Sequence, residues 1–243
     1  MLNEIITKLK VYEGNPPVEE LRKAAVLIAI VDCDEPELIY TLRSNKVGSH
    51  GGEVSFPGGM QEEDDISLEI TALRESEEET GLNRDQVQII GSTDTVVSRY
   101  NVSVTPYVGI VPDNISLNND SDEIEACFRV PINYLLEDKR YRNDRIERNG
   151  ESFFMPAYKF DSFIIDLERL ALYKAVLLKL ALINSVLIAE ISERSASEKL
   201  QFINLELFIK DLERRQLEKF SFSKVNPDKS NLFSGFSIIH LLR

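Results

Sequence analysis

The stretch that decides the fold of this chain begins with FPGG at 56–59 and continues, fourteen residues later, with RESEEETGL at 74–82. The second part holds four acidic residues within five positions: Glu75, Glu77, Glu78 and Glu79. On a helix, Glu75, Glu78 and Glu79 share one face because they lie at i, i+3 and i+4, and their charges repel. Gly81 is a natural helix stop, so these acids fall in the last turns, where the helix dipole favours cations.

Two interpretations of this acidic face are open. A divalent cation would relieve the repulsion, and carboxylate oxygens are the hard ligands that Mg²⁺ and Mn²⁺ select. The alternative is a solvated acidic face without a ligand. The residues around the helix favour the first interpretation.

The glycine turn and the helix together resemble the Nudix box of nucleoside diphosphate-linked hydrolases. The general box has one residue fewer between its glycine and its arginine, and a small or aliphatic residue where Ser76 stands. It also has a glutamate midway, where this chain offers a run of four acids: Glu62, Glu63, Asp64 and Asp65.

The chain is similar to the coenzyme A diphosphatase branch of that family in two respects. It has the same extra residue between the glycine and the arginine, and a longer stretch of its sequence looks like the signature of that branch. This stretch runs from LIYTLRS at 38–44 through His50, Gly52 and Glu53 to the FPGG turn. Two positions depart from the branch. Gly48 stands where its signature has an arginine, and the chain has no tryptophan for the element that usually opens the last helix, reading FIIDL at 163–167 instead.

The resemblance implies roles for the box residues. Glu75, Glu78 and Glu79 are expected to bind the metal ion together with the backbone carbonyl of Gly58, and Arg74 to orient these glutamates. In this family the catalytic base comes from the box, here Glu79, or from a distal acidic loop. The second source is NNDSDEIEACF, with four acids: Asp120, Asp122, Glu123 and Glu125. Glu123 is our choice, and its alternative is a solvated loop acid.

Three residues are expected on the substrate side. Arg43, at the end of a strand entering the site, can bind phosphate through both edges of its guanidinium. His50 can contact phosphate or, alternatively, fix a turn, and Gly59 lines the turn. With bound metal, Lys46 and Arg99 would add positive potential.

Composition narrows the partners. The formal net charge is −13, which argues against nucleic acid or an anionic membrane because both need a basic surface. Cys33 and Cys127 are too few for a disulfide framework or a zinc site. The start MLNEIITKLKVYEG lacks a cleavable signal pattern. We expect a cytoplasmic enzyme with a small-molecule diphosphate as substrate.

Apolar patterns predict alternating elements. The expected elements are helices at 2–11 and 131–137, strands at 23–31, 37–43, 53–56, 126–130 and 152–160, strands within 87–112, and a box helix starting at 64–67. The box helix should bury Ile66, Ile70 and Leu73. With the resemblance, this order predicts a Nudix-type α/β/α sandwich with a mixed sheet as domain 1–162.

The last third differs. Residues 163–191 read as an apolar helix centred on AVLLKLALINSVLIA, and 197–220 as an amphipathic one. Lys179 and Asn184 interrupt the apolar run, so a membrane span is not expected. We predict a helical extension, 163–243, that packs on the domain or forms a homodimer interface.

The function implied is metal-dependent hydrolysis of the diphosphate in coenzyme A or its thioesters, giving 3′,5′-ADP and (acyl-)phosphopantetheine. One alternative is another nucleoside diphosphate-linked substrate. The other is a catalytically silent Nudix module that binds a nucleotide.

Overall fold

The structure, a computed structural model, describes residues 2–46, 51–98, 100–118, 121–136, 140–148 and 151–166. The predictions for Gly48, His50, Arg99 and Asp120 lie outside these residues, as do those for 167–243.

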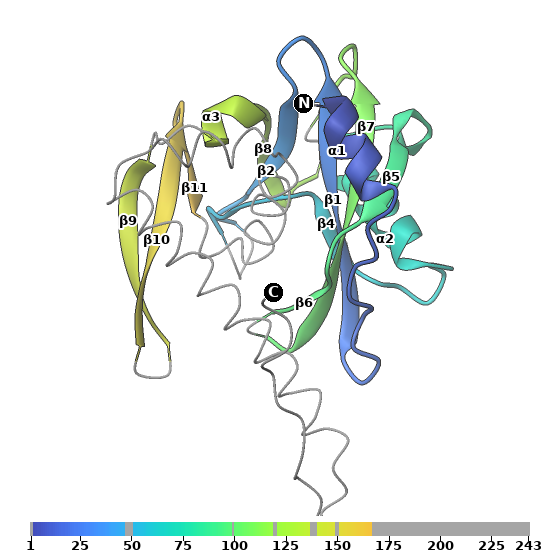
Figure 1. The fold of residues 1–243 in the computed structure, drawn as a ribbon, viewed down its shortest axis with the longest axis horizontal. Helices are drawn as coiled ribbons and strands as arrows, with labels where there is room; N and C mark the ends of the chain where they lie inside the picture. The colour runs from blue at the N-terminus through green and yellow to red at the C-terminus, as the bar shows by residue number, and fades with distance from the viewer. Residues whose placement is uncertain are drawn as a thin grey trace, which may run out of the picture.

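The described chain forms two β-sheets with helices on either side of the larger one (Figure 1). The elements of its first half are α1 (Leu2–Leu9), β1 (Arg22–Asp32), β2 (Glu37–Arg43), β3 (Val54–Ser55), β4 (Gly58–Met60), α2 (Leu68–Thr80) and the short 3₁₀ helix η1 (Arg84–Gln86). Those of its second half are β5 (Gln88–Ser92), β6 (Val96–Val97), β7 (Val102–Pro112), β8 (Ile124–Pro131), α3 (Ile132–Leu136), β9 (Arg140–Arg148), β10 (Glu151–Phe160) and β11 (Phe163–Asp166).

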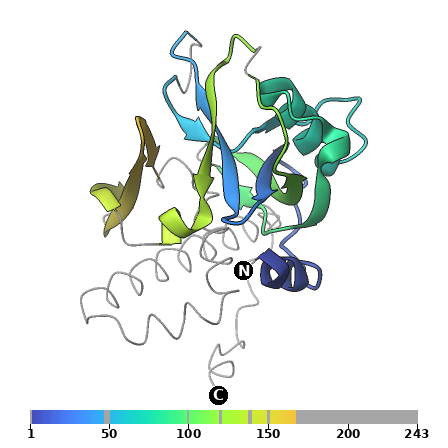
Figure 2. The same ribbon diagram turned by 90° about the horizontal axis from the view of Figure 1, so that it is seen from above.

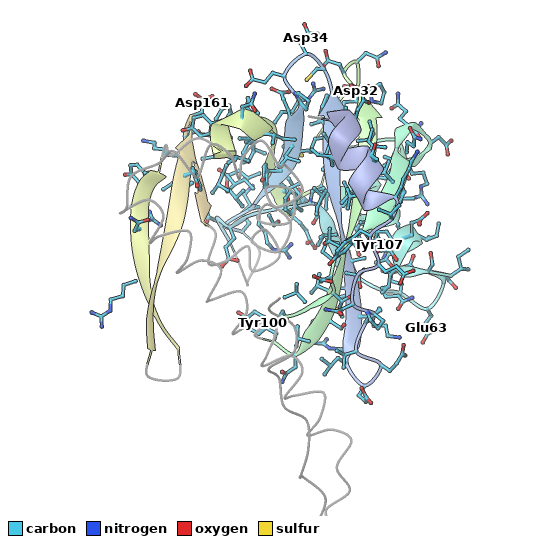
Figure 3. The ribbon with its side chains drawn as sticks, in the orientation of Figure 1. Asp32, Asp34, Glu63, Tyr100, Tyr107 and Asp161 are labelled. Carbon is cyan, nitrogen blue, oxygen red and sulfur yellow. The ribbon has the colours of Figure 1, made fainter. Side chains whose placement is uncertain are left out.

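The central pair of the larger sheet is β1 and β7, which run parallel over eleven paired positions from Arg22↔Val102 to Asp32↔Pro112. Every other pairing in this sheet is antiparallel, so the sheet is mixed, as predicted. Figure 3 shows the length of this pair, with Asp34 beyond one end and Tyr100 at the other.

β1 is apolar from Ala24 to Val31 because both of its faces are covered there. Ile28 and Ile30 point into a core shared with α1 and α3, while Leu27 and Ala29 point into a second core shared with α2. Alternate residues of a strand face opposite sides of a sheet, so a strand buried on both sides reads as one continuous apolar run. The predicted α/β/α arrangement is confirmed, and Figure 2 shows α1 and α2 on different sides of the sheet.

The box helix, α2, begins and ends where its caps dictate. The Ser67 side chain accepts a hydrogen bond from the Ile70 backbone N–H at 3.2 Å, and Gly81 adopts a left-handed φ of 67° while donating to the Glu77 carbonyl at 2.9 Å. Serine at the N-cap and glycine beyond the last turn are the residues that helix ends prefer.

The predicted buried face of α2 is wrong. Ile66 precedes the N-cap and is 90% exposed, and Ile70 and Leu73 are only partly buried. The side chains that α2 buries are smaller: Leu68, Thr71, Ala72, Ser76 and Thr80. Small residues let the helix lie close to the sheet. The face that they form fixes the orientation of the helix about its axis, and this orientation decides which glutamates face Gly58 and Gly59.

Three strands were not predicted. FPGG was expected to be a turn, but Gly58–Met60 is β4, which pairs antiparallel with Ala24, Ala25 and Val26 of β1. β9 was not predicted because most residues of its sequence, RYRNDRIER, are charged. The helix expected from Phe163 is wrong for its first four residues, since Phe163–Asp166 forms β11 on the edge of β10.

The smaller sheet, in the order β11-β10-β9, docks against the larger one through aromatic contacts. The rings of Phe163 and Phe128 stack with centroids 3.8 Å apart. Phe128 in turn lies 5.8 Å from Tyr40, and Tyr40 stacks on Phe56 at 4.8 Å. This series of rings therefore connects the smaller sheet to the residue that opens the FPGG segment.

None of the helices within the described residues is long and apolar enough to cross a membrane. The apolar run at 175–189 and the division of the chain at residue 162 are not tested by these residues and stay predictions.

Candidate active site

Gly58 and Gly59, at the start of β4, lie very close to their neighbours in β1 and α2. A Cβ on Gly58 would lie 2.3 Å from the Ala25 carbonyl oxygen, and Gly58 has a φ of 154° that other residues rarely adopt. A Cβ on Gly59 would lie 2.4–2.6 Å from the carboxylate atoms of Glu75. The absence of side chains at both positions thus lets the backbone of β4 approach the acidic helix.

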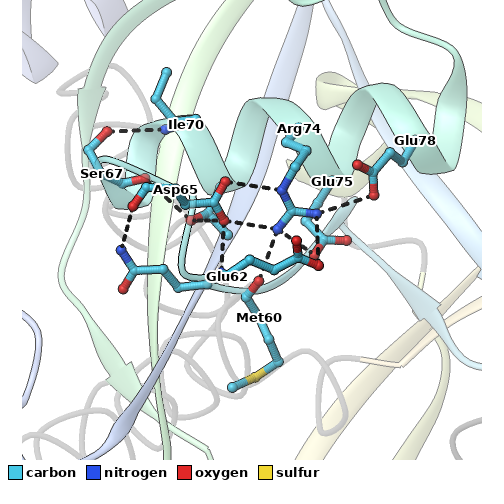
Figure 4. A network of polar contacts seen from close by, with 10 residues as sticks. Met60, Glu62, Asp65, Ser67, Ile70, Arg74, Glu75 and Glu78 are labelled. Atoms are coloured by element: carbon cyan, nitrogen blue, oxygen red, sulfur yellow. Dashed lines mark hydrogen bonds and ion pairs between the residues drawn. The ribbon is translucent and has the colours of Figure 1, made fainter.

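Arg74 lies at the centre of a network of carboxylates (Figure 4). Its guanidinium contacts Glu75 at 3.1 Å and Glu78 at 3.2 Å, and it donates to the Met60 carbonyl at 3.1 Å. Glu62 is more distant, at 3.8 Å. The predicted repulsion between Glu75 and Glu78 is therefore partly offset by the arginine beside them.

Asp65 is the acid that binds Arg74 most closely. It accepts from Arg74 Nε at 3.1 Å and Nη2 at 2.9 Å, and also from the Thr71 hydroxyl and the Glu62 backbone N–H, each at 3.0 Å. The hydrogen bonds from Arg74 are the main cause of a pKa well below the usual range for Asp65. The sequence offers four consecutive acids, at 62–65, as partners for Arg74. Only the fold of the loop selects Asp65, three residues before Leu68.

Glu79 is a partly buried carboxylate that faces the FPGG segment. It accepts a hydrogen bond from the Gly58 backbone N–H at 3.1 Å. Burial raises the pKa of its carboxyl to about 7, against this hydrogen bond. Burial also raises the pKa of Glu75, although Arg74 opposes that shift.

Glu77 faces away from this cluster. Its carboxylate accepts from Arg84 Nε at 2.6 Å and from the Arg84 backbone N–H at 3.3 Å, beyond the end of the helix. The division of the four acids into a face of three and one outlier therefore matches the predicted helix geometry.

The structure brings Arg43 and Glu123 together near the box. Arg43 Nη2 lies 3.1 Å from Glu123 Oε2, and the Ser44 backbone N–H donates to the Glu123 carbonyl at 2.7 Å. Both charges act on Glu79, since Arg43 lowers the pKa of the Glu79 carboxyl and Glu123 raises it. The distal acidic loop thus lies beside the box, at the end of β2.

Cys127 is a neighbour of the site that sequence patterns did not reveal. Its thiol lies 3.6 Å from the Glu79 carbonyl oxygen and 3.8 Å from that of Asn118. Burial is the main cause that raises its pKa to about 11, so the thiol stays protonated and can donate its one proton to either carbonyl.

The residues present fit a divalent cation. Two carboxylates, Glu75 and Glu79, are partly desolvated with raised pKa values, and a nearby cation would stabilise their charged forms. Carboxylate oxygens of Glu75, Glu78 and Glu79 are a suitable donor set for Mg²⁺ or Mn²⁺. In the described part of the chain, however, no three acidic, cysteine or histidine side chains already form a closed set of ligands. Glu78, turned to Arg74, is 57% exposed.

Fold and site together define a class of enzyme. The family model of the NUDIX domain matches residues 21–149, more than half of the chain, so this protein belongs to the Nudix family. It is a Nudix hydrolase, an enzyme of diphosphate bonds.

Two similar proteins are both named "Uncharacterized Nudix hydrolase NudL". The one from Yersinia enterocolitica is 38% identical over 151 residues, which cover 61% of this chain and 77% of that protein. The one from Yersinia pestis is 40% identical over 129 residues, covering 53% of this chain and 65% of that protein. The chain thus spans about two thirds to three quarters of their lengths.

Solved structures of other Nudix proteins are more distant. The Nudix domain of Shewanella oneidensis NrtR, complexed with ADP ribose, matches with 17% identity and a TM-score of 0.40, over 52% of this chain and 79% of that one. A Caenorhabditis elegans Ap4A hydrolase matches with 18% identity and a TM-score of 0.39, over 45% of this chain and 80% of that one.

Proposed function

We propose that this enzyme hydrolyses the diphosphate of coenzyme A or its thioesters, with Mg²⁺ or Mn²⁺, to 3′,5′-ADP and (acyl-)phosphopantetheine. The observation that carries the proposal is the meeting of Glu79 with the Gly58 N–H at 3.1 Å, beside the Arg43–Glu123 pair. Together with the LIYTLRS and FPGG motifs, this contact supports a site in which the proposed metal ligands lie near the arginine proposed to bind phosphate.

In this proposal Glu75, Glu78, Glu79 and the Gly58 carbonyl hold the metal. Bound there, the ion would supply neutralisation of phosphate oxygens and a more acidic water. Arg74 holds Glu75 and Glu78 by the ion pairs described above, and Asp65 fixes Arg74.

The substrate side of the proposal uses other residues. Arg43 binds a phosphate. Gly59, whose lack of a side chain leaves room for the Glu75 carboxylate, is assigned to the substrate side of the FPGG segment. We also assign substrate binding to His50, from its place in the sequence between Arg43 and the FPGG segment. Glu123 accepts the proton of the attacking water, with Glu79 as the alternative base.

A second candidate is hydrolysis of another nucleoside diphosphate-linked compound. Gly48 and the absence of tryptophan favour it, because both depart from the coenzyme A branch where substrate recognition would lie. A silent nucleotide-binding module is less favoured, since a module without metal chemistry has no need of three carboxylates on one helix face.

A product-resolved screen tests the proposal. The full chain would be incubated with coenzyme A, acetyl-coenzyme A, ADP-ribose, NADH and a dinucleoside polyphosphate, each with Mg²⁺, Mn²⁺ or EDTA. We expect 3′,5′-ADP from the first two with metal and none with EDTA. Faster cleavage of another compound selects the second candidate. No cleavage of any compound, together with melting curves that metal does not shift, supports the silent module.

A further inference from the structure

Glu123 and Arg43 form an ion pair beside the proposed site. Arg43 ends β2, and Glu123 directly precedes β8, which pairs with β2 along its length. A shift in register occurs between Leu42 and Arg43, where Arg43 pairs with Ile124. The irregularity, with the Ser44 N–H bond to the Glu123 carbonyl at 2.7 Å, sets the two side chains opposite each other.

This pair is accessible to a ligand. The Glu123 side chain is 57% exposed and that of Arg43 28% exposed. Both charges act on the Glu79 carboxyl, so the pair lies within the electrostatic reach of the acidic helix. An anion that approaches this helix therefore meets Arg43 while the Glu123 carboxylate is still paired with that arginine.

Phosphate is the stronger partner for Arg43. Exposed ion pairs between single side chains are weak and give way to competing ions. A diphosphate offers several charged oxygens and can bind a guanidinium through two parallel hydrogen bonds. Two anions on one arginine repel, so a bound phosphate would push the Glu123 carboxylate away.

We propose that Glu123 occupies, in the free enzyme, the place on Arg43 that a substrate phosphate takes, so that substrate binding breaks the Arg43–Glu123 pair and releases the carboxylate. This inference rests on the proposed function, because it uses Arg43 as the phosphate-binding residue. Its consequence is that Glu123 becomes a free proton acceptor only when substrate is present. Arg43 is then a positioning residue for Glu123 as well as a substrate contact.

Binding of a diphosphate that cannot be hydrolysed tests this exchange. The probe is α,β-methylene-ADP with Mg²⁺, titrated calorimetrically into the full chain. Glu123→Gln removes the competing charge, so we expect this variant to bind the probe about two- to fivefold more tightly than the unchanged protein. In an Arg43→Gln background the same substitution should have no such effect, because the pair is already absent.

Asp122→Asn is the matched control, since Asp122 is an exposed acid of the same loop. It removes the same charge without touching the pair, so it measures general repulsion of the probe. If Arg43→Gln binds too weakly to measure, Arg43→Lys provides a second background. Lysine keeps the charge but loses the planar fork, so the effect of Glu123→Gln should shrink there without vanishing.

Three results would overturn the exchange: an equal effect of Glu123→Gln in both backgrounds, no effect beyond that of Asp122→Asn, or no binding of the probe by the unchanged protein. The proposed function fails separately. If the chain cleaves no diphosphate in the screen but the coupling between Arg43 and Glu123 persists in probe binding, only the assignment of activity is lost.

Discussion

At the scale of single residues, Arg74 explains how an acidic helix end is tolerated. Its guanidinium binds Asp65 through two nitrogens and also contacts Glu75 and Glu78. These carboxylates and the hydrogen bonds they accept raise the pKa of Arg74 above its already high value. The positively charged Arg74 thus holds Glu75 and Glu78 in place, and these glutamates are proposed ligands of the metal ion.

The glutamates on the two sides of α2 should respond differently to the loss of charge. Glu78→Gln keeps the size of the side chain but removes a proposed ligand, so turnover should fall by several orders of magnitude while stability without metal holds or rises. Glu77→Gln affects only the contact with Arg84 and should stay within about twofold of normal turnover. Steady-state kinetics on the best substrate gives both values. Equal losses would show that the assigned helix face is wrong.

Asp65 should make stability depend on pH. Its folded-state pKa is below the unfolded value of about 3.9, so its stabilisation is complete above that pH and is lost as the pH falls further. Asp65→Asn should lower the free energy of unfolding by about 3 kcal/mol at neutral pH, and the difference should shrink below about pH 4. Urea unfolding at several pH values measures it. Asp64→Asn, an exposed neighbour, should show no such trend.

At the scale of elements, both ends of α2 are capped, but its middle buries an unpaired hydroxyl group. Ser67 and Gly81 satisfy the backbone at the two ends. Ser76 is 1% exposed on the buried face, and its hydroxyl has no hydrogen-bond partner among the described residues. A buried hydroxyl without a partner lowers stability, whereas a capping hydroxyl raises it.

Two serine substitutions in this helix should therefore have opposite signs. Ser76→Ala removes the unpaired hydroxyl and improves helix propensity, so it should raise the free energy of unfolding by about 1 kcal/mol. Ser67→Ala removes the N-cap and should lower it by about 1 kcal/mol. Chemical denaturation measures both. A loss of stability in Ser76→Ala would mean that a buried water satisfies the hydroxyl.

At the scale of the whole molecule, the two sheets are joined near the site. Aromatic stacking runs from Phe163 through Phe128 and Tyr40 to Phe56, which precedes the glycine turn. The hydroxyl of Tyr134 in α3 also donates to the Lys159 carbonyl at 2.5 Å. The position of the smaller sheet is thus coupled to the start of the FPGG segment.

The apolar segment that follows β11 predicts association between chains. Its surface exceeds what one small sheet covers, and a two-fold dimer is the commonest closed assembly. Multi-angle light scattering should give about twice the chain mass of 27.7 kDa. A monomer at micromolar concentration would contradict the prediction and assign this segment to the core of its own chain.

The sequence by itself determined the elements that depend on local patterns. The glycine that ends α2, the apolar run of β1 and the helical spacing of Glu75, Glu78 and Glu79 all follow from residues close together in the chain, whereas the start of α2 was predicted only to within residues 64–67. The Nudix family could be inferred from the same stretch, because the chemistry of its box needs fixed spacings.

Only the tertiary structure decided which residues meet across the fold. It selected Asp65 from four neighbouring acids by burying its carboxylate under Arg74. It placed Arg43 against Glu123 through the β2–β8 pairing. It also made strands of the FPGG segment and of the charged β9, whose side chains show no strand pattern. The physical reason is common to all three: strand pairing and buried ion pairs depend on partners distant in sequence, which local propensity does not contain.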